Sequence, residues 1–212
     1  MQMANLDTKE VSFRWYRDFF KRKLDILISL VAVIALAIPM IIIAICVKKD
    51  DPHAKIWFRQ ERIGEDNRPF VIYKFRTMVD NAPHRMATAE FQNSQMYITK
   101  IGKVLRKTSL DELPQLFNVL KGEMSLIGPR PLISKERKVL DLRDQLGANK
   151  VLPGITGLAQ VHGRDELNDK KKAMFDGQYA NQVSFSLDMK IFYKTIFDVL
   201  HSRGIHDGNE DN

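Results

Sequence analysis

The sequence predicts an α+β fold that is mostly helical. An N-terminal re-entrant membrane helix hairpin should precede a compact domain with amphipathic interfacial helices and a few short strands. Three observations predict this fold: a charge-free apolar run at residues 26–47, a pair of segments rich in β-branched and aromatic residues, and apolar residues at helical spacing downstream. We expect three parts: residues 1–50 for the interfacial N-terminus and membrane helix, 51–203 for the compact domain, and 204–212 for a disordered tail.

The apolar run is long enough to cross a bilayer, because a straight helix over residues 26–47 would reach about 33 Å. Two features favour a hairpin that enters and leaves on one side. Both flanks are basic, which favours both ends in the cytoplasm. Pro39 removes a backbone donor and clashes with the carbonyl of Ala35, so the helix should kink. A single bent span with the N-terminus outside is the alternative.

The segment before the apolar run, residues 10–23, is aromatic and basic. Such residues suit the bilayer interface, where an apolar ring can lie at the depth of the lipid headgroups. We therefore expect four aromatic side chains at that depth: Trp15, Tyr16, Phe19 and Phe20.

Downstream, hydrophobic spacing and turn signals predict the elements of the compact domain. Two strands separated by Gly-Glu-Asp-Asn should form a hairpin, and residues 81–97 should form a variable loop or short helix. Residues 185–200 predict a strongly amphipathic helix. The expected elements are strands at 56–63 and 69–78, helices at 113–120 (ended by Gly122), 133–146, 165–180 and 185–200, and turns at 153–154, 157 and 163.

The block at residues 106–131 carries the strongest chemical signal. An acidic pair, Asp111-Glu112, follows two cations, and the block ends with Arg130 between two prolines. Carboxylates can hold a divalent metal or attack phosphorus. A single arginine can donate two hydrogen bonds to the oxygens of one phosphate. The block therefore contains the groups needed to handle a phosphate.

The acidic pair should lie at the N-terminus of a helix. Ser109-x-x-Glu112 matches a capping box, although Pro114 fits a cap at Asp111 better. In either case the free N–H groups and the helix dipole would favour phosphate. For an isolated motif of this kind, two ordinary first-turn acids that stabilise a helix would be the simpler interpretation.

The net charge of +7 favours an anionic partner. Because the chain also carries a membrane run, we expect an anionic bilayer surface or a phosphorylated substrate and no nucleic acid. Cys46 is the single cysteine, so no intramolecular disulfide is possible. The five histidines show no metal-ligand spacing.

Several long segments, in order, resemble the bacterial sugar transferase family of small monotopic phosphoglycosyl transferases. They are FKRKLDILIS, RQERIGEDNRPFVIYKFRTM, the acidic block, PGITGLAQVHGR and SLDMKIF. The resemblance implies transfer of a sugar-1-phosphate from a UDP-sugar to polyprenyl (undecaprenyl) phosphate, giving polyprenyl diphosphate sugar and UMP. This reaction would be the first membrane step of exopolysaccharide, capsule, lipopolysaccharide O-antigen or glycoprotein glycan assembly.

The resemblance also implies roles for particular residues. Asp111 would be the nucleophile that forms an aspartyl phospho-sugar, and Glu112 would bind Mg²⁺. Pro39 would break the membrane helix, although Ile38 stands where the family has serine. Candidates for substrate contacts are Lys74, Arg76, Arg106, Arg130 and Arg164, with Asp188 positioning one of the arginines.

The catalytic domain would face the cytoplasm at the bacterial inner membrane, and a homodimer is a plausible assembly. Two alternatives remain open. The first is direct transfer between two bound substrates, with Asp111 only as a metal ligand. The second is a membrane-anchored basic protein that recruits a partner without catalysis, which leaves the ordered acidic block unexplained.

Overall fold

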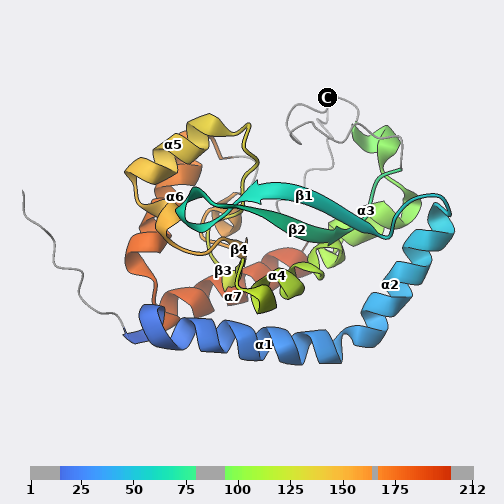
Figure 1. The fold of residues 1–212 in the computed structure, drawn as a ribbon, viewed down its shortest axis with the longest axis horizontal. Coiled ribbons are helices and arrows are strands. Elements are labelled where there is room, and N and C mark those ends of the chain that lie inside the picture. Colours follow the sequence, from blue (N-terminus) through green and yellow to red (C-terminus); the bar gives the residue numbers. More distant parts are fainter. Residues whose placement is uncertain (1–14, 80–93, 164–166, 202–212) are drawn as a thin grey trace, which may run out of the picture.

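The computed structural model describes residues 15–79, 94–163 and 167–201 (Figure 1). Helices predominate, and the strands form two small two-stranded sheets. The helices are α1 (Lys21–Ala35), α2 (Ala37–Asp50), α3 (Lys100–Lys107), α4 (Gln115–Lys121), α5 (Arg137–Gln145), α6 (Asp169–Gln182) and α7 (Phe185–Leu200), and the strands are β1 (Trp57–Ile63), β2 (Pro69–Phe75), β3 (Ser125–Ile127) and β4 (Gly154–Thr156). A turn of π-helix, Tyr16–Phe20, leads into α1.

The apolar run forms α1 and α2, which meet at Leu36 with a bend of 62°. Pro39 is the third residue of α2, in the first helical turn, where a missing N–H group is tolerated. The predicted kink is therefore confirmed, with the break three residues before the proline. Within the described residues no single helix is long and apolar enough to cross a bilayer, whereas the bent pair meets that test by length and composition.

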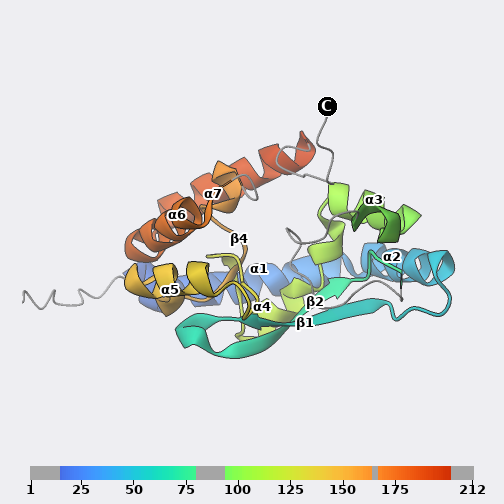
Figure 2. The same cartoon turned by 90° about the horizontal axis from the view of Figure 1, so that it is seen from above.

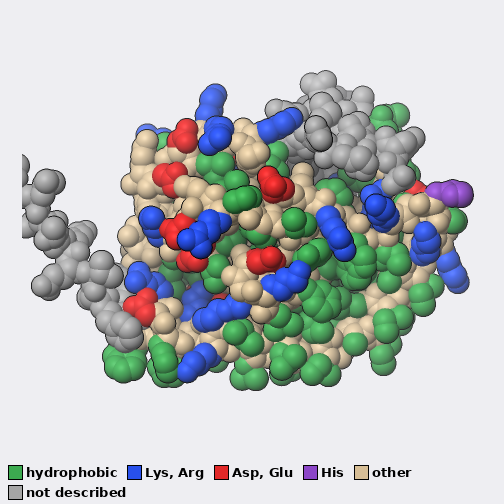
Figure 3. Space-filling view, viewed as in Figure 1, with side chains coloured by type: hydrophobic (Ala, Val, Ile, Leu, Met, Phe, Trp, Pro, Cys, Tyr) green, Lys and Arg blue, Asp and Glu red, His purple; other side chains and the backbone are tan. Residues whose placement is uncertain are grey.

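Both helices bury a narrow face and expose a broad apolar one. On α2, Met40, Ile43 and Val47 pack against Phe75 and Leu105. On the outer side Ile34 and Ile38 are 69% and 72% exposed. Hydrophobic side chains consequently gather along the lower edge of the molecule, over α1 and α2 (Figure 3).

Strands β1 and β2 form the predicted antiparallel hairpin, with Trp57 paired to Phe75 and Ile63 to Pro69. The connecting turn places Asp66 and Asn67 at positive φ, a conformation that these two residue types adopt more readily than most. The β1–β2 hairpin and helices α6 and α7 lie on opposite sides of the molecule (Figure 2), and α1 runs along its lower edge in Figure 1.

A second sheet was not predicted: β3 and β4 pair in parallel, Ser125 with Gly154 and Ile127 with Thr156. Their loops approach so closely that a Cβ at Gly154 would lie 2.1 Å from the backbone nitrogen of Gly128, so a side chain is excluded there. This contact fixes the start of the Gly-Pro-Arg-Pro loop. Sequence signals predicted turns at 153–154 and 157 but did not show that two distant segments pair.

Helix boundaries agree with the sequence prediction at α7 and differ at α5. Residues 133–136 form a turn in which the Glu136 carboxylate accepts from the Ile133 N–H at 2.9 Å, so α5 begins at Arg137. On α7 the buried positions are Asp188 and Ile191, while Phe192 and Ile196 of the expected apolar stripe are exposed.

A buried polar cluster ties α1 to α6 and α7. Asp188, 2% exposed, accepts hydrogen bonds from Tyr16 at 2.7 Å, Lys21 at 2.7 Å and Tyr179 at 2.9 Å. On the next turn of α1 the Asp25 carboxylate accepts from Ser125 Oγ at 2.7 Å. The expectation that Asp188 positions an arginine is not met in the described residues, because its carboxylate binds a lysine and two tyrosines.

Of the four aromatic side chains expected at the depth of the lipid headgroups, Tyr16 takes part in this cluster, and the depth of all four in a bilayer stays a prediction. The Tyr16 hydroxyl points into the domain, toward Asp188, whereas the neighbouring aromatics Trp15, Phe19 and Phe20 are exposed. The tail at 204–212 and most of residues 81–97 lie outside the described residues.

Candidate active site

The acidic pair lies in a single 3₁₀ turn, Leu110–Glu112, between α3 and α4. Ser109 adopts a left-handed conformation with φ 56°, and its side chain makes no capping hydrogen bond. The predicted capping box is therefore wrong. Pro114 occupies the position before α4, and the carbonyl of Leu110 accepts from Leu113 instead. The turn keeps both carboxylates ahead of the helix.

Strand β2 delivers a lysine to this turn. Side chains on a strand alternate, so Lys74 shares a face with Ile72, which is buried against Val119 and Met124 near α4. Lys74 Nζ lies 2.6 Å from Glu112 Oε1 and 3.9 Å from Asp111 Oδ2. A single ammonium thus serves both members of the acidic pair.

The Gly-Pro-Arg-Pro loop delivers the second cation. Arg130 Nη1 lies 3.6 Å from Glu112 Oε1. The loop is held from behind, because Arg143 donates to the carbonyl of Arg130 at 2.9 Å while its other nitrogens bind Asp176. Sequence reasoning missed Arg143, since nothing in a helix pattern shows which loop a helix side chain will support.

Asp111 is a buried carboxylate, 8% exposed. Burial raises the pKa of Asp111 above its ordinary value, and the charge of Glu112 adds to this, while Lys74, Arg106 and Arg130 oppose it. Lys74 Nζ lies 2.6 Å from Glu112 Oε1 but 3.9 Å from Asp111 Oδ2, so Glu112 makes the closer ion pair. The two neighbouring acids therefore have different environments, as expected if one is a nucleophile and the other a metal ligand.

The remaining predicted cations lie at varying distances from the pair. Arg106, at the end of α3, donates to Thr77 Oγ1 at 2.9 Å, and its charge acts on Asp111. Arg76 directly follows β2, where its N–H donates to the carbonyl of Ile56. Arg164 lies outside the described residues. The structure thus brings Lys74, Arg106 and Arg130 around the two acids.

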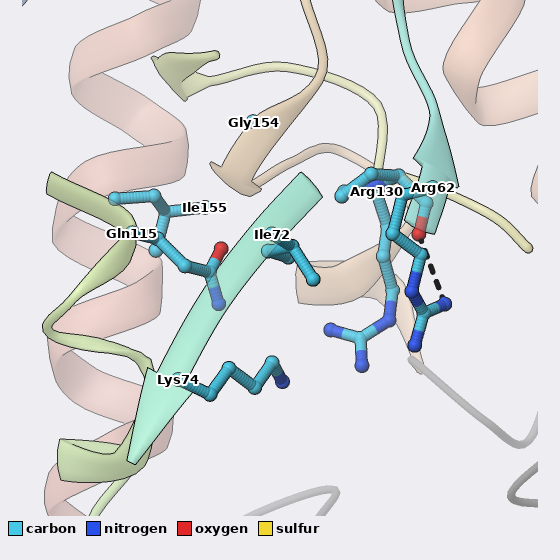
Figure 4. Close-up of a pocket in the computed structure, with 8 residues that line it drawn as sticks. Arg62, Ile72, Lys74, Gln115, Arg130, Gly154 and Ile155 are labelled. Atoms are coloured by element: carbon cyan, nitrogen blue, oxygen red, sulfur yellow. Dashed lines mark hydrogen bonds between the residues drawn. The ribbon is translucent and has the colours of Figure 1, made fainter. Parts of the chain in front are cut away.

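A small pocket that is partly open to solvent lies beside the pair (Figure 4). Lys74 and Arg130 line it together with Arg62 and Gln115, neither of which was among the predicted site residues. Arg62 is one of several arginines on the β1–β2 hairpin, and only tertiary packing shows that it lies near Arg130. Ile72 and Ile155 add apolar side chains to the lining of the pocket.

A buried asparagine fixes β2 relative to the acidic turn. Asn118, on α4, accepts from the Tyr73 N–H at 3.1 Å and donates to the Val71 carbonyl at 2.7 Å. Asn118 is fully buried, so water cannot replace these hydrogen bonds. Asn118 therefore helps to fix the position of β2, and with it Lys74, relative to Asp111 and Glu112.

The donor set fits one mode of Mg²⁺ binding. Among the described residues no three His, Cys, Asp or Glu side chains gather in one place. Mg²⁺ is commonly held by one or two carboxylates, with substrate phosphates and water completing the shell. Glu112, with Asp111 beside it, fits that mode.

The fold and the site define a class of protein: a domain with paired carboxylates beside clustered cations, joined to a bent pair of apolar helices. Comparison with known families is specific. Residues 16–202 match the family described as bacterial sugar transferase, and the chain belongs to that family.

Curated relatives include proteins with and without an assigned substrate. The chain is 44% identical over 154 residues to the uncharacterized sugar transferase EpsL of Bacillus subtilis, covering 73% of this chain and 74% of EpsL. It is 41% identical over 194 residues to UDP-N-acetylgalactosamine-undecaprenyl-phosphate N-acetylgalactosaminephosphotransferase of Aeromonas hydrophila, covering 88% of this chain but 45% of the relative.

A third relative is UDP-glucose:undecaprenyl-phosphate glucose-1-phosphate transferase of Klebsiella pneumoniae, 40% identical over 185 residues, with 84% of this chain and 39% of the relative covered. The chain thus spans less than half the length of both relatives whose names give a substrate. These names describe different sugars, so similarity alone does not select a donor.

Proposed function

We propose that this protein transfers a sugar-1-phosphate from a UDP-sugar to polyprenyl (undecaprenyl) phosphate, giving polyprenyl diphosphate sugar and UMP. The observation that carries the proposal is the buried Asp111 beside Glu112, with Lys74 and Arg130 paired to the glutamate. The names of the Aeromonas and Klebsiella relatives support the two substrate classes.

In the first step an Asp111 carboxylate oxygen attacks the β-phosphorus of the donor. The bond from that phosphorus to the bridging oxygen breaks, and its electron pair leaves on UMP. An ionised carboxylate needs no general base. Lys74 and Arg130 offset the charge of the diphosphate and of the leaving phosphate as it develops.

In the second step a phosphate oxygen of the polyprenyl phosphate attacks the aspartyl phospho-sugar. The bond between phosphorus and Asp111 breaks, the carboxylate is restored, and the polyprenyl diphosphate sugar departs. Bound Mg²⁺ would supply charge neutralisation at the diphosphate, and Glu112 is the residue we propose to hold it.

We further propose that α1 and α2 enter the inner membrane of a bacterium as a re-entrant hairpin, with the catalytic domain in the cytoplasm. The bend of 62° and the exposed apolar faces of both helices support this placement. The lipid acceptor would then meet the acidic pair without leaving the bilayer surface. A further relative, 35% identical over 198 residues, is the exopolysaccharide production protein ExoY of Sinorhizobium fredii, and its name supports exopolysaccharide assembly as the process.

The test is acceptor-dependent UMP release. Purified protein in nanodiscs would be incubated with Mg²⁺, undecaprenyl phosphate and a panel of UDP-sugars. We expect release with one donor sugar and none without the lipid beyond a single turnover. Folded protein that releases no UMP with any donor would contradict the proposal and favour the recruitment alternative.

Isotope exchange separates the covalent route from direct transfer. Labelled UMP should enter the UDP-sugar pool in the absence of acceptor, because the first step is reversible on its own. Lack of exchange in a preparation that turns over with acceptor would favour direct transfer, with Asp111 acting only on the metal.

A further inference from the structure

The pocket beside the acidic pair contains two arginines with adjacent guanidinium groups. Figure 4 shows the side chains of Arg62 and Arg130 extending side by side into it. Arg62 donates to Gln60 Oε1 at 2.6 Å and to the Pro131 carbonyl at 3.3 Å. Its Nε is buried and has no hydrogen-bond partner among the described residues. A donor in that state can still bind a ligand.

The positive charges of Arg62 and Arg130 destabilise each other. Burial, followed by the charge of Arg130, lowers the pKa of Arg62 to about 10. The charges of Glu136 and Glu112 raise the pKa of Arg62, but the effect of each is smaller than that of burial or of Arg130. An anionic group between the two guanidiniums would satisfy both at once.

The cations are arranged in order of distance from the acids. Lys74 and Arg130 contact Glu112 directly, at 2.6 and 3.6 Å. Arg62 lies on the far side of Arg130 from Lys74 (Figure 4), and its own hydrogen bonds go to the Arg130-Pro131 loop and to its own strand. The series Lys74, Arg130, Arg62 therefore leads away from Asp111.

We infer that Arg62 and Arg130 clamp the phosphate that leaves with the nucleoside, so that Arg62 is a substrate-binding residue of the donor site. This inference rests on the proposed function. The attacked phosphorus must lie at Asp111, near Lys74, and the second phosphorus of a diphosphate is one bridging oxygen further along the series. When the bond to that oxygen breaks, the departing phosphate gains a negative charge beside two guanidiniums.

The experiment measures how much the phosphate adds to nucleotide binding. Affinities of the full-length protein for UMP and for uridine would be compared by titration, and the ratio would be determined again for Arg62→Gln. Removing one charge-assisted contact should reduce the preference for UMP about 10- to 100-fold and leave uridine binding unchanged. A purely structural role for Arg62 would weaken both ligands equally and leave the ratio intact.

Two further variants complete the test. Arg59→Gln removes the same charge from the same strand at an exposed position against Tyr73, and its ratio should match the unmodified protein. Arg62→Lys keeps the charge but loses the planar fork, so the ratio should fall several-fold even if Arg62→Gln does not fold. An unchanged ratio in both Arg62 variants that fold, or in Arg62→Lys alone, overturns the clamp.

The outcomes also separate this inference from the reaction on which it rests. Turnover by the unmodified protein together with an unchanged UMP preference in the Arg62 variants overturns the clamp and leaves the reaction standing. A raised KM for polyprenyl phosphate, with the UMP preference intact, assigns Arg62 to the acceptor and overturns the clamp as well. Absence of turnover with a reduced UMP preference in the variants retains the anion clamp and contradicts the reaction.

Discussion

At the scale of single residues, Asp111 combines a chemical demand with a cost in stability. The carboxylate must be ionised to attack phosphorus, yet burial raises its pKa. An acid whose pKa is higher in the folded chain than in the unfolded chain destabilises the fold when ionised, by about 1.4 kcal/mol per pKa unit. The ionised Asp111 carboxylate is thus needed for the reaction but lowers the free energy of unfolding.

Asp111→Asn should abolish turnover while making the protein more stable at pH 7. We expect activity to fall on the order of 10³-fold or more, because no other group can replace the nucleophile. Thermal unfolding measured from pH 7 to pH 3 checks the second part. The stabilising effect should be full above the raised pKa of Asp111 and disappear as pH falls toward the ordinary aspartate range, where the unmodified protein is protonated as well.

Asn replaces the charge without changing the shape of the side chain, so misfolding should not obscure this result. Substantial residual turnover would remove Asp111 from the role of nucleophile. A variant less stable than the parent at pH 7 would show that the ion pair with Lys74 outweighs the burial of the carboxylate.

Residue identity alone predicted the acids and most of the cations around them, because these side chains have chemistry that their neighbours in sequence lack. It did not predict Arg62, Asn118 or Arg143. Arg62 is one of several arginines on the β1–β2 hairpin. Its environment arises only when β1 packs beside the loop that contains Arg130. Asn118 and Arg143 act through backbone groups far away in the sequence.

At the scale of elements, sequence patterns predicted those helices and strands whose formation depends on neighbouring residues in the sequence. The β1–β2 hairpin and α7 have the predicted positions. Alternating hydrophobic residues extend along both strands, and amphipathic spacing extends along the helix. The capping box at Ser109 failed because the left-handed Ser109 and Pro114 end one helix before the next begins. The parallel pairing of β3 with β4 depends on contacts between distant segments, and each strand is only three residues long.

Pro39→Ala tests the bend between α1 and α2. The alanine N–H could donate to the carbonyl of Ala35, so a continuous helix becomes favourable by about 3 kcal/mol in that turn. We expect a fraction of the chains to present the N-terminus on the opposite side of the membrane from the C-terminus. Tags at the two termini, tested for accessibility in inside-out vesicles, would report this.

Pro52→Ala is the matched control, since Pro52 is exposed and lies beyond the end of α2. It should leave both tags on one side. An unmodified protein with its termini on opposite sides would contradict the re-entrant hairpin and favour the single bent span.

At the scale of the whole molecule, the membrane hairpin and the catalytic domain share one polar anchor. Asp188 on α7 joins Lys21 and Tyr16 at the start of the hairpin to Tyr179 on α6. Tyr179 also donates to the carbonyl of Ile127, the last residue before the loop that carries Arg130. The position of α1 and the position of the candidate active site are therefore fixed by the same buried group.

Asp188→Asn should destabilise the entire molecule. The substitution keeps the size of the side chain but leaves the ammonium of Lys21 buried with a weaker partner, and breaking a buried pair costs about 3 kcal/mol or more. In a chain of this length that loss lowers Tm by about 10 °C, as measured in detergent or nanodiscs. Asp198→Asn is the control on the same helix, because its ion pair with Lys194 is more exposed and should contribute less than about 1 kcal/mol. Equal Tm values for the two variants would show that Asp188 does not hold α1 to the domain, and the polar anchor would then have no part in fixing Arg130.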